Sequence, residues 1–415
     1  MNTQYIKMNF IRKLDSYAGP LLCRFLLLIK LVADYVSHRS KRKINPEAQD
    51  ILIIKFFGFG SILMAAPAIA GAKRKFPSGK IAMLTLMENK EVCELIPWID
   101  ELFLLDIGSL LKFPFNYFCI LSKVRRQQFD IVVDLEFLTC FSALTTLCIA
   151  LFSGEKTSVG FNSPMYWRNL VYEINVSFDH SRHISRIFGK VFSSFAEGSL
   201  DLSFNEEKKH LLSTRGHNIL DEIPELKSVA SGGQKIVCVN INAGVLSFNR
   251  RWPKEHFNVL ITELIKDPNL KIVLIGGKGD IEYVEGFTRE LPSSIPNVIN
   301  LCGKLSIKKL VGFFVHSEVL ITNDSGPLHI AYLVGTPTIS FFGPETPFLY
   351  GPLGENHYVF YEDLHCSPCL NIYNSKFSRC NDNICLKKID PQKVLDLIKE
   401  KKLLDAREGS RSVQV

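Results

Sequence analysis

The sequence lacks a long hydrophobic run free of charge, which is the feature that a membrane-spanning helix needs. The strongly apolar stretch at residues 21–36 is interrupted by Arg24, Lys30 and Asp34. A spanning helix takes about 20 largely uncharged residues, so this stretch is too short and too charged to cross a bilayer. Residues 139–152 form a second apolar stretch that is shorter still and is expected in a protein core. No small-residue cleavage site follows the first stretch, which argues against a cleaved signal peptide.

Beyond its N-terminus, the chain also lacks an excess of charge of either sign. The 415 residues carry a formal net charge of +7, from 49 basic and 42 acidic side chains. Residues 1–50 hold nine of these basic and four of the acidic side chains, so their net charge is +5 and the other 365 residues carry only +2. A nearly neutral body argues against a nucleic-acid-binding groove. A hydrophobic content of 47% fits a folded protein of one or two domains.

Residues 1–49 combine the apolar stretch with a basic cluster. On a helix with about 100° per residue, Arg24, Lys30, Asp34 and His38 fall within about one third of the circumference, which leaves a broad apolar face. Four basic side chains follow directly: Arg39, Lys41, Arg42 and Lys43. Two interpretations remain open. The helix either lies in the surface of an anionic bilayer or docks on the protein's own core.

From residue 50 onward, short β-branched runs alternate with helical stretches. The first half predicts strands at 51–55, 80–86, 101–105 and 130–135, with helices at 61–76 and 139–152. The second half predicts strands at 235–241, 271–275, 298–301, 318–322 and 338–342, with helices at 256–266, 307–315 and 327–334. Such alternation gives parallel sheets covered by helices. We therefore predict an α/β protein of two doubly wound, Rossmann-like domains with a ligand cleft between them.

A polar, turn-rich stretch at residues 203–234 marks the boundary between the two halves. The predicted domains are residues 50–230 and 231–405, with residues 406–415 as a tail. The second domain includes a loop that carries four cysteines.

The segment after the strand at 318–322 has the composition of an anion-binding site. Asp324 and Ser325 are good N-cap residues, Gly326 allows close approach of a ligand, and Pro327 opens a helix. Free amides at a helix N-terminus suit a phosphate group, and His329 falls in the first turn. Taken alone, the segment is equally well an ordinary helix cap.

Three more segments follow strands of the second half. Arg250 and Arg251 follow the first strand and can neutralise a diphosphate. A glycine-rich turn at 276–279 precedes Asp280, and residues 342–346 form another glycine-containing turn. Because the carboxyl ends of parallel strands meet at one edge of a sheet, these segments are expected to converge on one site.

The sequence resembles glycosyltransferase family 9, the lipopolysaccharide heptosyltransferases and their relatives. The resemblance runs over residues 51–394 and is strongest at 51–67, at 249–253 and above all at 324–344 (DSGPLHIAYLVGTPTISFFGP). It implies a GT-B fold with an N-terminal acceptor domain and a C-terminal nucleotide-sugar domain. It further implies metal-independent, inverting transfer from ADP-heptose to a lipopolysaccharide core or related lipid-linked saccharide.

The resemblance also implies site residues. Arg250 stands where the family usually has a lysine that neutralises the leaving diphosphate. The donor-binding set that it implies is Gly60, Asp280, Asp324, Ser325, Gly326 and His329.

One position departs from the family pattern. Ser61 stands after the glycine turn where relatives commonly have an aspartate taken as the general base, and a serine hydroxyl cannot act as a base near neutral pH without a partner. Asp134 and Glu136 follow a strand of the first domain, and Glu136 is the better placed to replace that base, although it is equally well a helix-capping carboxylate. A relocated base, a displacement without a base, or loss of activity all remain open. Ser61 itself could bind a donor phosphate.

Eleven cysteines fall into two groups. Seven are scattered among apolar neighbours, as free thiols in a reducing cytoplasm would be. The other four, Cys366, Cys369, Cys380 and Cys385, have a spacing that can hold a structural zinc ion. A metal-free knuckle is equally compatible with this spacing, and no cofactor is required for the expected reaction.

The function expected from the sequence is therefore a glycosyltransferase, cytoplasmic and peripheral at the cytoplasmic face of the inner membrane. Its partners would be a nucleotide sugar, a lipid-linked saccharide and the membrane surface, with no nucleic acid. Two other functions remain open: a nucleotide-sugar epimerase of GT-B fold, and a nucleotide-sugar-binding protein without activity, which the serine at position 61 motivates.

Overall fold

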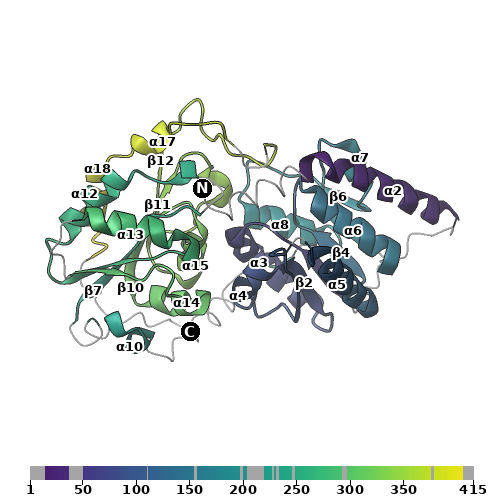
Figure 1. Cartoon of the computed structure of the whole chain (residues 1–415), viewed down its shortest axis with the longest axis horizontal. Coiled ribbons are helices and arrows are strands. Elements are labelled where there is room, and N and C mark those ends of the chain that lie inside the picture. Colours follow the sequence, from purple (N-terminus) through teal and green to yellow (C-terminus); the bar gives the residue numbers. More distant parts are fainter. Residues whose placement is uncertain are drawn as a thin grey trace. The chain divides into compact units, whose positions relative to one another are not determined.

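The computed structural model divides the chain into two compact units (Figure 1). Unit 1 consists of residues up to 210 together with 348–350 and 372–376, and unit 2 consists of the remainder. The structure describes residues 15–36, 50–109, 111–153, 157–196, 200–202, 219–226, 229, 233–244, 248–291, 297–374 and 378–404. The basic cluster at 39–43, the tail at 406–415 and most of the stretch at 203–234 lie outside these residues.

Unit 1 is built on a parallel sheet with the strand order β3-β2-β1-β4-β5-β6. β1 and β4 lie side by side in its centre, with Ile54 opposite Asp134 in the register. Side chains of both strands are buried along their whole length, because helices cover the two faces of the sheet. The strands are β1 (Ile51–Ile54), β2 (Ile81–Leu86), β3 (Glu101–Leu105), β4 (Ile131–Asp134), β5 (Thr157–Phe161) and β6 (Ile174–Val176).

The helices of unit 1 pack in groups around this sheet. α3 packs against α8, and α6 packs against both α5 and the N-terminal helix α2 (Figure 1). α3 begins two residues earlier than the sequence predicts, because Gly58 adopts a positive φ of 88° and serves as its N-cap. The helices are α2 (Gly19–Val36), α3 (Phe59–Lys75), α4 (Lys90–Cys93), α5 (Phe113–Gln127), α6 (Cys140–Ser153), α7 (Tyr166–Asn169) and α8 (Ile184–Ser193), with a 3-10 turn η1 (Met87–Asn89).

Unit 2 repeats the arrangement with the strand order β12-β11-β10-β7-β8-β9, again all parallel. β7 and β10 occupy the centre, as β1 and β4 do in unit 1. The strands are β7 (Lys235–Asn240), β8 (Leu270–Leu274), β9 (Val298–Asn300), β10 (Ser317–Asn323), β11 (Thr338–Phe342) and β12 (His357–Tyr361).

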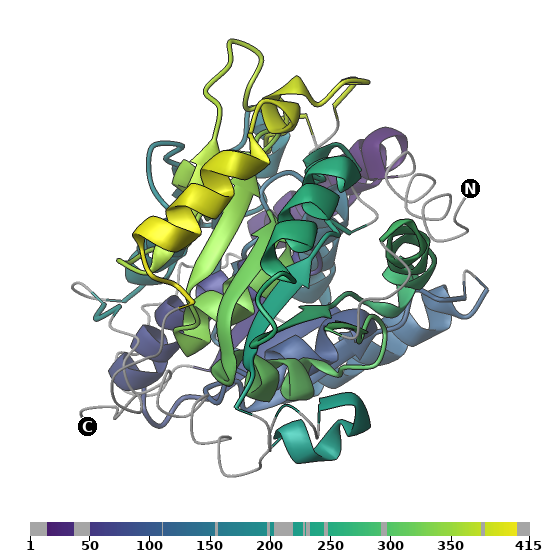
Figure 2. The same ribbon diagram turned by 90° about the vertical axis from the view of Figure 1, so that its left-hand side faces the viewer.

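An aromatic cluster anchors the core of unit 2. Trp252 is fully buried and stacks on Phe341 at 4.2 Å between ring centroids, with Phe257 edge-on to both. α12 and α18 lie side by side over this part of the sheet (Figure 2). The helices are α10 (Ile219–Glu222), α12 (Lys254–Leu264), α13 (Ile281–Glu290), α14 (Ile307–Val315), α15 (Gly326–Val334), α16 (Pro347–Tyr350), α17 (Ile384–Lys387) and α18 (Pro391–Glu400), with 3-10 turns η3 (Pro224–Leu226), η4 (Phe248–Arg250) and η5 (Lys278–Asp280).

The predicted α/β class is confirmed, and every strand that the sequence predicts is present within a residue or two at its ends. In the described part of the chain, no helix is both long and apolar enough to cross a membrane.

Candidate functional site

Both sheets have their topological switch point between the two central strands, where ligands of doubly wound proteins bind at the carboxyl ends. In unit 2 this point lies between β7 and β10. A buried polar network joins the two strand ends: Asn240 Nδ2 donates to Thr322 Oγ1 at 3.0 Å and to Ser325 Oγ at 2.8 Å. Asn323 lies beside it, and its side-chain oxygen accepts a hydrogen bond from the Trp252 amide. The network fixes the loop that carries Asp324 and Ser325.

Arg250 and Asp324, which the sequence predicts as site residues, meet at this point. Arg250 Nη1 lies 3.2 Å from Asp324 Oδ2, and its Nη2 donates to the Ala243 carbonyl oxygen at 3.0 Å. Both side chains are mostly buried. Nε of Arg250 is buried without a hydrogen-bond partner among the described residues. The ion pair holds a guanidinium at the switch point with donor capacity left for a ligand.

The helix N-terminus predicted after β10 is present next to this pair. α15 begins at Gly326, and Ser325 is its N-cap in extended conformation, without a side-chain hydrogen bond to the first turn. Because the Ser325 hydroxyl is engaged by Asn240 and Thr322, the first turn keeps the amide of Gly326 uncapped by that side chain. An uncapped helix N-terminus beside a guanidinium favours an anion. His329 lies in the same helix and is buried.

Arg251, which follows Arg250 in the sequence, contacts other residues. The Arg251 guanidinium lies 3.8 Å from the centroid of the Tyr283 ring and 4.6 Å from that of Phe248. One of its nitrogens is 3.8 Å from Asp280 Oδ1, and Asp280 Oδ2 accepts the Gly277 amide at 3.1 Å. Burial raises the pKa of Asp280 above its ordinary value. The two arginines therefore contact different acidic partners and do not form one cationic cluster.

A glycine permits the close packing of this loop. A Cβ on Gly276 would lie 2.4 Å from Asn242 Nδ2 and 2.6 Å from Cys302 Sγ. Any larger residue would force the side chains of Asn242, two residues beyond the end of β7, and Cys302 to move.

In unit 1, the loop after β1 carries the other predicted residues. Gly60 and Ser61 lie in the first turn of α3, and Ser61 is partly exposed. The Ser61 hydroxyl donates to the Gly58 carbonyl oxygen at 2.7 Å. Its proton is thus directed at the backbone, and no side chain among the described residues bonds to this hydroxyl to make it a base.

Glu136 follows β4 and bonds to the same loop, which follows β1. Its Oε1 accepts three hydrogen bonds, from Lys55 Nζ at 2.8 Å, Phe56 N at 2.9 Å and Phe57 N at 2.8 Å. The structure gives its second oxygen, Oε2, no partner among the described residues. Glu136 therefore has one anchored oxygen and one that can still accept a proton.

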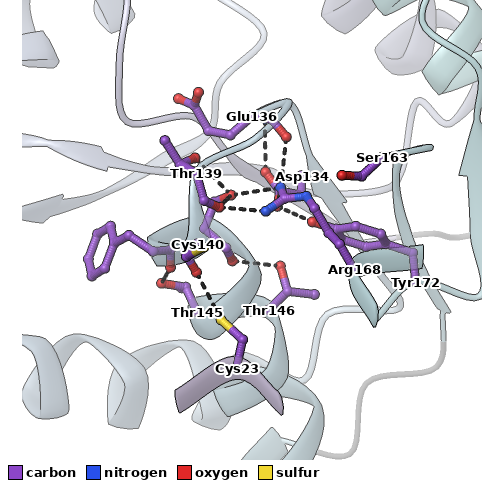
Figure 3. Close-up of polar contacts among 12 residues, drawn as sticks. Cys23, Asp134, Glu136, Thr139, Cys140, Thr145, Thr146, Ser163, Arg168 and Tyr172 are labelled. Carbon is purple, nitrogen blue, oxygen red and sulfur yellow. Dashed lines mark hydrogen bonds and ion pairs between the residues drawn. The ribbon is translucent and has the colours of Figure 1, made fainter. Parts of the chain in front are cut away.

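Asp134, by contrast, is fully buried in a network that Figure 3 shows. Its Oδ2 accepts the Tyr172 hydroxyl at 2.5 Å and lies 3.3 Å from Arg168 Nη2, while Oδ1 accepts the amide of Glu136 at 2.9 Å. Arg168 is also fully buried and donates to the carbonyl oxygens of Glu136 and Thr139 (Figure 3). Asp134 is thus a structural residue that fixes the turn after β4.

The sequence reasoning missed two residues of this region. Lys55 directly follows the apolar strand β1, and a lysine at the carboxyl end of an apolar run is the signal that could have identified it. Arg168 lies on the short helix α7, 32 residues from Glu136, and nothing in its local sequence marks it as a partner of β4.

The four clustered cysteines are free thiols in unit 2. Burial, together with the nearby Cys369, Cys380 and Cys366, raises the pKa of Cys385 to about 11. Within the described residues, however, no three His, Cys, Asp or Glu side chains come together as a metal-binding group. The geometry therefore gives no support for a zinc site.

Comparison with known proteins identifies heptosyltransferases among the relatives of this chain. A model of glycosyltransferase family 9 (heptosyltransferase) matches residues 118–377. Lipooligosaccharide heptosyltransferase 2 of Campylobacter jejuni is 28% identical over 173 residues, which are 41% of this chain and 53% of that protein. The chain thus spans about half the length of this relative. Lipopolysaccharide heptosyltransferase 1 of Campylobacter coli is 24% identical over 360 residues, covering 84% of this chain and 98% of that one.

Solved structures show the same fold. The glycosyl transferase family 9 protein from Veillonella parvula DSM 2008 matches with a TM-score of 0.63 at 21% identity, covering 88% of this chain and 99% of that chain. The E. coli heptosyltransferase WaaC with ADP matches with a TM-score of 0.62 at 17% identity, covering 85% and 99%. The predicted GT-B fold is thereby confirmed.

Proposed function

Because this chain belongs to glycosyltransferase family 9, we propose that it transfers a sugar from a nucleotide donor to a lipopolysaccharide core or related lipid-linked saccharide. The proposed donor is ADP-heptose, with inversion at the anomeric carbon and without a metal ion. Two structures of one relative support this choice of donor, since E. coli heptosyltransferase WaaC is solved with ADP in one and with ADP-2-deoxy-2-fluoro heptose in the other.

The observation that carries the proposal is the Arg250–Asp324 pair beside the N-terminus of α15. We assign the donor to this part of unit 2. The diphosphate would take hydrogen bonds from the Arg250 guanidinium and from the first amides of α15, which are suited to its negative charge. Asp324 would then accept hydrogen bonds from donor hydroxyls, and Ser325, Gly326 and His329 would shape the same subsite. Asp280 and Gly60 remain predicted donor-binding residues.

In the proposed reaction, an acceptor hydroxyl oxygen forms a bond to the anomeric carbon as the bond from that carbon to the diphosphate oxygen breaks. Negative charge builds up on the departing diphosphate, and Arg250 stabilises it without a divalent cation. The proton of the hydroxyl passes to a base. Glu136 is the candidate in unit 1, because its Oε2 can accept a proton while Oε1 stays anchored.

One observation favours a second candidate function. The position after the glycine turn carries Ser61, whose hydroxyl donates its proton to Gly58. A protein that binds a nucleotide sugar without transferring it would need no base at this position. Donor binding without transfer to any extracted lipopolysaccharide acceptor would support this candidate.

Replacement of Arg250 tests the proposed function. Arg250→Ala should lower the transfer rate by about 10²–10³-fold, because the leaving diphosphate loses its main cation. Arg250→Lys should restore part of the rate, since a lysine keeps the charge but not the two-pronged geometry. The rate is measured with ADP-heptose and extracted lipopolysaccharide acceptors.

Arg289→Ala is the matched control, because Arg289 is exposed on α13 of the same unit. It should transfer at the rate of the unaltered protein. Near-normal transfer by Arg250→Ala would remove Arg250 from the mechanism.

A further inference from the structure

The N-terminal helix α2 exposes apolar side chains along its whole length. Phe25 is 62% and Leu28 60% exposed, and Val32 follows one turn later at 54%. Soluble proteins rarely leave so continuous an apolar surface in water unless a partner covers it. The exposed apolar residues of the helix, together called the outer face, are Leu21, Leu22, Phe25, Leu28, Ile29, Leu31, Val32, Tyr35 and Val36.

The opposite stripe of the helix, which packs on unit 1, is narrow. Cys23 and Leu27 are buried against α6, α7 and the residues that follow α7 (Figure 1). The Cys23 thiol donates to the Cys140 carbonyl oxygen at 3.3 Å, and Asp15 accepts hydrogen bonds from the amides of Cys140 and Phe141 at the start of α6. α2 is thus docked on its own unit and still presents its outer face away from that contact.

One charged residue of α2, Lys30, shows the same reversal, whereas Arg24 is exposed. Lys30 is buried in the inner stripe, where its amine lies 3.4 Å from Asp34 and 3.5 Å from Glu173 of unit 1. A surface helix in water normally buries its apolar side and exposes its charges. Here Lys30, which interrupts the apolar run in the sequence, points toward unit 1. The outer face therefore carries one charge fewer than the sequence of the helix indicates.

We propose that the outer face of α2 lies in the surface of an anionic lipid bilayer. The helix meets the two requirements for such binding: it is apolar over about 5 turns, and the sequence beside it is basic. Lys7, Arg12 and Lys13 precede the helix, and Arg39, Lys41, Arg42 and Lys43 follow it. Basic side chains next to an apolar face attract anionic headgroups.

The same charge argues against a second copy of the chain as the occupant. Two copies meeting through their outer faces would bring two N-terminal segments, each with a net charge of +5, close together. A bilayer of anionic lipid neutralises that charge. This inference does not depend on the transferase proposal, because binding to lipid can be measured with no donor or acceptor present.

Vesicle binding by the full chain tests the proposal. Vesicles of phosphatidylglycerol and phosphatidylethanolamine should bind the purified protein at about 0.1 M salt, and vesicles of phosphatidylcholine alone should bind it more weakly. The triple variant Phe25→Glu, Leu28→Glu, Val32→Glu should bind the anionic vesicles at least about tenfold more weakly, because it places carboxylates in the lipid-facing surface.

Val259→Glu provides the matched control, since Val259 is half exposed on α12 of unit 2 and lies outside the outer face. It should bind like the unaltered protein. Circular dichroism and thermal melting establish that the triple variant is folded, which is expected because its three positions are exposed.

Three results would overturn the proposal. The first is failure of the unaltered protein to bind anionic vesicles, and the second is equal binding by the folded triple variant. The third is a dimer of the unaltered protein, detected by light scattering, that the triple variant converts to a monomer, since this would make a second copy the occupant. If the triple variant does not fold, the single variant Leu28→Glu replaces it in the same assay.

Discussion

Glu136 illustrates how a single carboxylate can serve two purposes through its two oxygens. Oε1 accepts the amides of Phe56 and Phe57 together with the Lys55 ammonium, so it sets the course of the loop that leads to Ser61. Oε2 has no partner among the described residues. A base held in this way loses little conformational freedom when it takes a proton, because its position is already fixed by the anchored oxygen.

Glu136→Gln tests whether this carboxylate is the base. The amide oxygen of glutamine can still accept hydrogen bonds from the loop, so we expect the free energy of unfolding to fall by only about 1–3 kcal/mol. Transfer should fall by about 10²–10⁴-fold, since an amide cannot take the proton. Donor affinity, measured by calorimetry, should be unchanged.

Lys55→Met is the control for this variant, because it breaks the same buried ion pair from the other side. It should destabilise the fold by about 3–5 kcal/mol, since the carboxylate is left buried without its cation. If Glu136 is the base, Lys55→Met keeps measurable transfer at a temperature where it is folded. Equal loss of transfer in both variants would mean that Glu136 acts only through the loop.

The carboxyl of Asp280 gives a prediction about pH. Burial raises its pKa above the ordinary value of 3.8, so the folded state binds more protons than the unfolded state between that value and the folded pKa. The free energy of unfolding should therefore decrease as pH rises through this window. Urea unfolding followed upward from about pH 4 should show a steeper decrease for the unaltered protein than for Asp280→Asn, which does not titrate at this position. Parallel profiles would contradict the assignment.

Site residues that follow a strand in the sequence could be predicted. Residues whose side chains extend to a strand end from a distant part of the sequence could not. Asp324 directly follows β10 and Arg250 lies in the segment that follows β7, so the topology brings them together as the alternating pattern indicates. Arg168 reaches the end of β4 from α7, and only the three-dimensional packing reveals it. The direction of Arg251 depends on the rings of Phe248 and Tyr283, which the sequence does not place beside it.

At the scale of an element, α2 shows a limit of helix periodicity as a guide to orientation. The periodicity places Arg24, Lys30 and Asp34 on one polar side, and the usual rule would turn that side to solvent. Instead, Lys30 is buried beside Glu173, because an acidic partner on unit 1 compensates its charge. The periodicity of the helix does not include this partner on unit 1, so it could not predict that Lys30 is buried.

A pair of neighbouring leucines tests which side of α2 belongs to the core. Leu27 is 4% exposed and belongs to a cluster with Leu147 and Trp167, whereas Leu28 is 60% exposed. Leu27→Ala should lower the free energy of unfolding by about 2–5 kcal/mol, because it leaves a cavity.

Leu28→Ala, the matched change at the adjacent position, should alter the free energy of unfolding by no more than about 0.5 kcal/mol. Urea unfolding without lipid measures both. Similar losses in the two variants would show that the docking of α2 differs from the one described.

At the scale of the whole molecule, the alternation of strands and helices was enough to predict two parallel sheets. It did not reveal the interior strand β5 or the edge strands β6 and β12. β6 has three residues and β12 is only partly buried, so neither has the continuous apolar run that marks a central strand. The central strands, which carry the candidate residues, are the ones with the clearest signal.

The division of the chain into units also matters for protein engineering. Residues 372–376 belong to unit 1 although they follow most of unit 2 in the sequence, and Tyr373 packs edge-on against Phe137 and bonds to His180 Nε2 at 2.6 Å. A chimera that joined the first 210 residues of this protein to the second half of a relative would therefore receive a foreign residue at this contact. An exchange of specificity between family members has to move the 372–376 segment together with unit 1.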